Sequence, residues 1–296
     1  MTNAPLAAAS DLLPPSAVPP QGSLLDQALE FAEARNITLP VFSDVALRVQ
    51  KAANDESYDI AAIEKGIESD PALVAEVLRA SNTAFFAGLS QISSIKAAVL
   101  RLGLKRMANL VFLATEKNRY TAKNPRISQL MNTLWRHSAA CACGSEWIAR
   151  KVRYPQFSET VFIAALVHDI GKLYLLRVLD QMTAEGKAEA VSPELIVEVI
   201  DRAHAQVGFT LLASWNLPEV YQTIVRDHHA EIADPANVPL QIVRLANYAC
   251  TKVGASLHPD ASLDLSALPE TIVLGLGDVA IAELEILLED LEAKVA

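Results

Sequence analysis

The chain has 296 residues, of which 51% are hydrophobic and 20% are charged, so it can bury a large core as one domain or as two closely packed ones. A formal net charge of -10, without any long run of Lys and Arg, argues against a nucleic-acid-binding surface. No apolar run reaches the roughly 18 residues of a membrane helix and no signal peptide opens the chain, so we expect a cytoplasmic protein without membrane contact.

The first half of the chain predicts a tail followed by helices. Residues 1–22 are rich in Pro and Ala and lack a hydrophobic period, which is typical of a disordered tail or linker. Beyond them, short Pro, Gly or Ser breaks separate helical patterns at residues 24–35, 41–53, 59–68, 71–81, 94–102 and 105–117. Asp59 and Asp70 are expected to cap two of these helices, and Gly103 to end a third.

The second half carries histidines on the apolar faces of its helices. We expect helices at residues 128–151 and 238–253, and others that open at Pro193 and Pro218. The polar residues on their buried lines are His137, His204, His228, His229 and Asn247. No alternating run is long enough for a convincing strand, so the predicted fold class is all-α, a bundle of many helices.

Residues 160–173 place two ionisable side chains inside this bundle. Seven apolar residues, from Val161 to Val167, lead directly into His168 and Asp169. A segment that is apolar on every side is expected to be buried. Burying an imidazole and a carboxylate costs several kcal/mol unless they are paired. We therefore expect either a metal ion or a dense hydrogen-bond network around them.

The inward histidines as a group can likewise be interpreted as metal ligands or as members of a hydrogen-bond network. A single inward histidine is more often a hydrogen-bonded core residue than a metal ligand. Five of the six histidines lie on buried lines, however, and only His258, beside Pro259 in a loop, looks incidental. Imidazole and carboxylate together suit Fe, Mn, Zn or Ni, and the pattern does not decide among them. Asn247 could equally well hydrogen-bond a histidine. The three cysteines are expected to be reduced core residues.

The order of these residues resembles a known family. His137, the H-D-I-G-K run from His168, His204 and the pair His228-His229 follow the order found in the HD superfamily of metal-dependent phosphohydrolases. Residues 69–86 and 92–107 resemble the N-terminal half of the HDOD domain, the HD-related output domain of bacterial signalling proteins. The resemblance implies an all-α HD/HDOD bundle at residues 23–250, with halves 23–125 and 126–250. Residues 251–296 would form a helical extension packed on it.

The resemblance favours one function and leaves a second open. The favoured one is a response-regulator-like output module that acts through a signalling protein partner rather than by catalysis. The alternative is a metal-dependent phosphohydrolase acting on a phosphoester or nucleotide. Its ions would be bound by His137, His168, Asp169, His204, His228 and His229, with Asn247 as a further candidate ligand, and would activate water. Lys172 would then steady a phosphate, whereas in the other interpretation it is a solvated lysine.

Two departures from the pattern of the HD superfamily bear on this choice. The late-helix Asp of the HD ligand set corresponds to Asn247, which should weaken metal binding. The Gly-Tyr-Pro signature of the cyclic-di-GMP phosphodiesterase branch is missing.

Residues 278–296 are acidic and rich in Leu at helical spacing, which is typical of a closing helix packed on the bundle, with a homodimerisation helix as the alternative.

Overall fold

The computed structural model describes residues 22–39, 42–53, 60–82, 86, 91–187, 192–231 and 233–295. These residues form helices and turns and contain no strand, so the predicted all-α class is confirmed. No helix among them combines the length and the apolar composition that crossing a membrane requires. Residues 1–21 of the predicted tail, and Asp59 as a predicted cap, lie outside the described residues.

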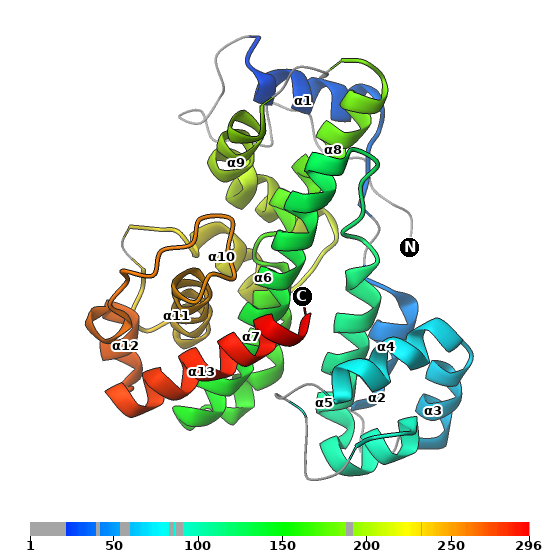
Figure 1. The fold of residues 1–296 in the computed structure, drawn as a ribbon, viewed down its shortest axis with the longest axis vertical. Coiled ribbons are helices and arrows are strands. Elements are labelled where there is room, and N and C mark those ends of the chain that lie inside the picture. Colours follow the sequence, from blue (N-terminus) through cyan, green and yellow to red (C-terminus); the bar gives the residue numbers. More distant parts are fainter. Residues whose placement is uncertain are drawn as a thin grey trace. The chain divides into compact units, whose positions relative to one another are not determined.

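The chain divides into two compact units, the first of which holds the histidines. This first unit consists of Met1–Leu39 and Tyr120–Leu288, and the second of Pro40–Arg119 and Glu289–Ala296. The elements of the first unit (Figure 1) are α1 (Leu24–Ala34), α6 (Pro125–Lys151), η3 (Pro155–Phe157), α7 (Ser158–Val167), α8 (Ile170–Ala184), α9 (Pro193–Ser214), α10 (Glu219–Asp227), α11 (Val238–Lys252), η4 (Leu265–Ala267), α12 (Pro269–Leu274) and most of α13 (Asp278–Val295).

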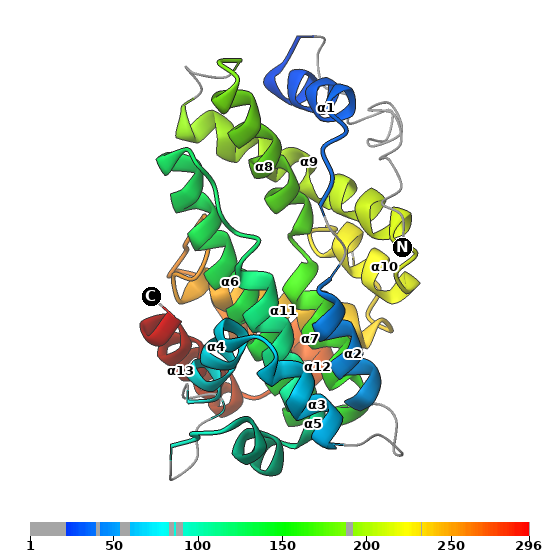
Figure 2. The same cartoon turned by 90° about the vertical axis from the view of Figure 1, so that its right-hand side faces the viewer.

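In the second unit, three helices pack against a fourth. These are α2 (Asp44–Ala53), α3 (Ile60–Glu68) and α4 (Pro71–Ser81), which contact α5 (Ile95–Lys117; Figure 2). Asp70 caps α4 as predicted, because its side chain accepts hydrogen bonds from the first-turn backbone. Gly103 interrupts α5 between the two predicted helices, since this glycine adopts the non-helical angles φ 78° and ψ 163°.

Local hydrogen bonds explain where the helix that carries His137 begins. The pattern predicted a start at residue 128, but α6 begins at Pro125. The Asn124 side chain accepts hydrogen bonds from the N–H groups of Arg126 and Ile127, and the Asp180 carboxylate accepts one from the Asn124 N–H. This capping adds a first turn that hydrophobic periodicity alone does not reveal.

The helices around the histidines pack closely. Helix α7 is buried along its whole apolar run and contacts α6, α10 and α11. Helices α8 and α9 cross where Gly171 meets Gly208, and a Cβ atom on Gly171 would lie only 2.0 Å from the His204 carbonyl oxygen. This close approach requires glycine and brings the start of α8 against the part of α9 that carries His204.

The C-terminal helix makes ion pairs with two helices of the first unit. Glu283 of α13 accepts a hydrogen bond from Lys151 of α6, and Glu285 accepts one from Lys252 of α11. The Leu284 and Leu288 side chains face Gly144 of α6. These contacts hold α13, as far as Leu288, against the helices that carry His137 and Asn247.

Candidate metal centre

The junction between α7 and α8 places His168 and Asp169 in the core. Both side chains are almost completely buried, with 0% and 2% exposure. Helix α7 ends at Val167, and the Asp169 carbonyl accepts the first hydrogen bonds of α8, from the N–H groups of Lys172 and Leu173. The break between the two helices therefore orients two successive polar side chains into one interior site.

Backbone carbonyl groups fix the tautomers of four histidines. In each ring Nδ1 lies 2.6–2.8 Å from a carbonyl oxygen, and the pairs are His137 with Ala255, His168 with Ala165, His204 with Asp201, and His228 with Val225. Because a carbonyl oxygen only accepts, each Nδ1 carries the hydrogen and donates it. The Nε2 atom of each neutral ring is left with its lone pair available to a cation.

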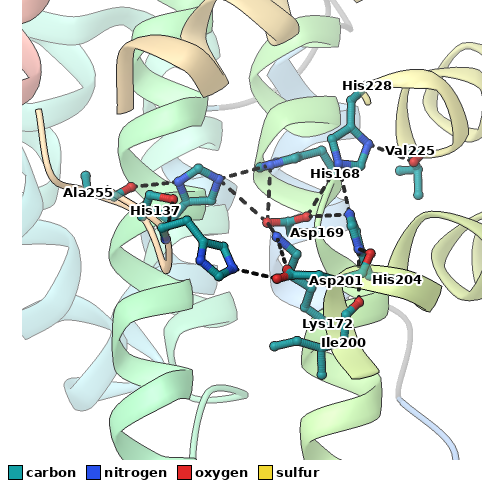
Figure 3. Close-up of polar contacts among 12 residues, drawn as sticks. His137, His168, Asp169, Lys172, Ile200, Asp201, His204, Val225, His228 and Ala255 are labelled. Carbon is teal, nitrogen blue, oxygen red and sulfur yellow. Dashed lines mark hydrogen bonds and ion pairs between the residues drawn. The ribbon is translucent and has the colours of Figure 1, made fainter. Parts of the chain in front are cut away.

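These four Nε2 atoms converge on the Asp169 carboxylate (Figure 3). Oδ2 lies 3.6 Å from His137 Nε2 and 3.5 Å from His168 Nε2. Oδ1 lies 3.4 Å from His204 Nε2 and 3.5 Å from His228 Nε2. The rings come from α6, from the α7–α8 junction, from α9 and from the end of α10, so the prediction that separate segments bring imidazoles together beside Asp169 agrees with the structure.

The contacts within the cluster fit a cation better than a closed hydrogen-bond network. His137 Nε2 lies 3.2 Å from His168 Nε2, and His204 Nε2 lies 3.2 Å from His228 Nε2. With every Nδ1 protonated, these contacts bring lone pairs together in neutral rings. Among the described residues, Asp169 Oδ1 is a buried atom without a hydrogen-bond partner. A shared positive charge would satisfy all of these atoms at once.

The donors form two groups that share Asp169. One contains His137, His168 and Asp169, and the other contains Asp169, His204, His228 and His229, with donor atoms within 4.8 Å of one another in each group. His229 is the exposed member. This nitrogen and oxygen set admits one or two divalent ions and suits Fe, Mn, Zn or Ni without selecting one.

The electrostatics of the cluster keep these groups in their metal-binding forms. Burial lowers the pKa of His137 and that of His168 to about 4, and it also lowers the pKa of His204. Burial alone would raise the pKa of Asp169, but the Lys172 ammonium and the surrounding imidazoles outweigh it and hold this pKa well below its usual range. At neutral pH the rings are therefore neutral and the carboxylate is ionised.

A cavity of about 760 Å³ opens onto the cluster. His137, Asp169, His204 and His229 line it together with Asn247 of α11, so the amide predicted to point inward reaches the same space. Lys172 also lines it and is buried rather than solvated, with Nζ 3.0 Å from Asp169 Oδ2.

Two residues at this cavity were missed by the sequence analysis. His258, which looked incidental, lines the cavity, and its Nε2 lies 2.5 Å from Asp201 Oδ2. His258 lies in the loop after α11, where no helical period could indicate its direction. Asp201 lies on α9 one turn before His204, and that spacing is the one signal that could have placed it near the site.

Comparison with known proteins identifies the family of this chain. Residues 39–231 match the model of the HDOD domain family, which is more than half of the chain. The chain belongs to the HDOD domain family. The resemblance of the sequence to the HDOD domain is thereby confirmed.

Similar structures share this fold. A crystal structure of an HDOD domain protein of unknown function from Geobacter sulfurreducens is 24% identical, with a TM-score of 0.71 over 92% of this chain and 96% of that one. A Shewanella amazonensis protein, proposed to be a metal-dependent phosphohydrolase, is 21% identical, with a TM-score of 0.69 over 92% and 98%. An uncharacterized protein of Treponema pallidum is 26% identical over 64% of this chain, which spans only 37% of that relative.

In this HDOD protein a buried arginine holds the segment that carries two of the histidines. Arg244 Nη1 donates to the carbonyl oxygens of Asp227, His228 and Ala230, at 3.3, 3.0 and 2.9 Å. Its Nε donates to Glu270 Oε1 of α12 at 2.7 Å. The side chain thereby fixes the backbone at the end of α10, although it lies beyond the segment that matches the family model.

Proposed function

We propose that this HDOD protein binds one or two divalent metal ions at the histidine–aspartate cluster and hydrolyses a phosphoester there. The observation that carries the proposal is the direction of the four Nε2 lone pairs, all of which face the ionised Asp169 carboxylate. A purely structural network would pair each of these atoms with a donor. The family resemblance to metal-dependent phosphohydrolases supports the same conclusion.

The residues of the cluster and the cavity would divide the work. The histidines and Asp169 would hold the ion. At neutral pH the imidazole rings are neutral and the Asp169 carboxylate is ionised, and these are the forms that bind a cation. A divalent ion in such a site lowers the pKa of a coordinated water and polarises a phosphoryl group. The Lys172 ammonium borders both Asp169 and the cavity, so it can donate hydrogen bonds to a phosphate oxygen of a substrate bound there.

A second candidate is the non-catalytic signalling module that the sequence favoured. In it, a bound ion would stabilise the bundle, and the protein would act through a signalling partner in the manner of a response regulator. Asn247, which lines the cavity, supports this candidate, because the resemblance to the HD superfamily implies a metal-binding carboxylate at this position. The geometry favours hydrolysis, because the remaining donors, Lys172 and an adjoining cavity are all present.

Metal analysis tests the proposal first. Protein purified without chelators or an affinity metal should contain a divalent ion, which is lost in a His168→Ala, Asp169→Ala double variant. His204→Gln, which removes one donor and retains most of the side-chain volume, should lower the metal content as well. His258→Ala is the matched control, since it removes a histidine from the same cavity but outside the two donor groups.

A phosphoesterase screen with added Mn or Fe then separates the two candidates. Hydrolysis that requires metal and disappears in the double variant would establish the enzyme. Metal that binds stoichiometrically without hydrolysis of any phosphoester would favour the signalling module. Metal-free protein, with unchanged folding in the double variant, would refute the metal site itself.

A further inference from the structure

One carboxylate that lines the cavity lies between two nitrogen donors. Asp201 of α9 has Oδ1 3.6 Å from Lys172 Nζ and Oδ2 2.5 Å from His258 Nε2. The three side chains come from α8, α9 and the loop after α11, and all of them line the cavity. Nitrogen donors from separate parts of the first unit thus hold the Asp201 carboxylate at this point of the cavity.

A contribution to folding stability does not explain why Asp201 and His258 are in contact. The His258 and Asp201 side chains are 62% and 34% exposed, and ion pairs this exposed contribute little to stability. The loop is already held by other contacts, because the Asp260 N–H donates to the Thr251 carbonyl at 3.0 Å and the Ala255 carbonyl accepts from His137. Contacts other than the one with Asp201 therefore hold the backbone of the loop that carries His258.

We propose that Lys172 and His258 form a binding site for a phosphate group of the substrate, and that Asp201 occupies this site until the phosphate displaces it. This inference rests on the proposed hydrolysis and narrows its substrate class. The scissile phosphate must lie at the cluster around Asp169, whereas Asp201 marks a second place within reach of the Lys172 ammonium, beside His258. The substrate would therefore carry a second phosphate group near the scissile one.

The chemistry of the two anions makes this exchange favourable. A phosphomonoester group carries a charge of about -1.5 to -2 at neutral pH and has three strong acceptor oxygens, so it forms more charge-assisted hydrogen bonds than a carboxylate. The cavity of about 760 Å³ can hold much more than one phosphate. The partial exposure of Asp201 leaves its side chain free to rotate toward solvent when it is displaced.

Binding of inorganic phosphate to the full chain, measured by calorimetry after treatment with a chelator, tests this inference. Asp201→Asn removes the competing charge at constant volume and should tighten phosphate binding about fivefold. His258→Ala should weaken it about fivefold, while His258→Arg, which retains nitrogen donors at this position, should preserve it. Asp260→Asn is the matched control: it removes a carboxylate from the same cavity, but that carboxylate accepts hydrogen bonds from Ser262.

Three results would overturn the inference. These are no detectable phosphate binding in the Asp201→Asn variant, equal tightening in the Asp260→Asn variant, and unchanged binding in the His258→Ala variant. The measurement requires neither metal nor catalysis. Its failure would therefore leave the metal site untouched, and a protein without metal would still give a phosphate result.

Discussion

Replacing Gly171 by alanine should damage the fold and the metal site together. A Cβ atom at this position would lie 2.0 Å from the His204 carbonyl oxygen and 2.8 Å from the Gly208 nitrogen. Carbon–oxygen contacts in proteins are rarely closer than about 3.3 Å, so the two helices would have to separate by more than about 1 Å. The obstructing atoms belong to backbone, so no side chain can rotate away to relieve the overlap.

The geometry sets the size of the effect. Adding a methylene-sized group to a packed core costs about 1–3 kcal/mol, and an overlap with backbone belongs at the upper end of that range. A loss of about 3 kcal/mol lowers the melting temperature of a domain this large by about 6–12 °C. Because the displaced backbone carries His204, metal affinity should also fall by about tenfold or more.

Thermal unfolding by circular dichroism and metal titration measure the two effects. Gly66→Ala is the matched control, because Gly66 lies within α3 and a Cβ atom there would meet nothing within 4 Å. The control should be neutral, or stabilising by up to about 1 kcal/mol, with metal binding unchanged. If Gly171→Ala melted within about 2 °C of the unmodified protein and bound metal as tightly, the close crossing of α8 and α9 would be wrong.

Three further predictions concern the surroundings of the cluster. Arg244→Met should destabilise the protein by about 3–5 kcal/mol because it leaves Glu270 buried without its partner, and adding Glu270→Gln should recover part of the loss in a double-mutant cycle measured by urea unfolding. In metal-free protein, the pKa values of His137 and His168 are about 4, against an ordinary 6.5. As pH decreases, the unfolded chain therefore binds protons at these two rings before the folded chain does. The free energy of unfolding should consequently fall between about pH 6.5 and pH 4. For each ring, the free energy of unfolding should change by up to about 1.4 kcal/mol per pH unit. Equal free energies of unfolding, measured with urea at about pH 5 and about pH 7.5, would contradict this prediction. Asn247→Asp, which adds a carboxylate to the cavity, should tighten Mn binding about tenfold by calorimetry, and weaker or equal binding would place this side chain outside the reach of the ion.

The sequence predicted the inward side chains but not how they are held. Helical periodicity was enough to turn His137 and His204 toward the core, because each lies on the apolar line of a long helix. The carbonyl partner of His137 is Ala255, 118 residues away, and no local pattern specifies a contact between α6 and that loop. His258 escaped prediction for the same reason, since a loop has no period from which a direction can be deduced.

Glycine and arginine gave weaker signals than histidine. Gly171 stands in the H-D-I-G-K run, but the sequence does not reveal that α9 passes over it closely enough to exclude a Cβ atom. Arg244 looks like an ordinary helix residue, and its burial follows only from the presence of Glu270 and three acceptor carbonyl groups in the folded chain. Features that depend on two distant segments could not be predicted from either segment alone.

The partners of the donors matter as much as the histidine pattern itself. The family match ends at residue 231, yet the Ala255 carbonyl sets the tautomer of His137, and Arg244 fixes the backbone of His228 from beyond that point. Without the carbonyl, Nε2 of His137 could carry the ring hydrogen and would no longer offer a lone pair to a cation. Two HDOD chains with identical histidines can therefore differ in metal affinity through residues outside the matched segment, and the histidine pattern alone does not establish which of them bind metal.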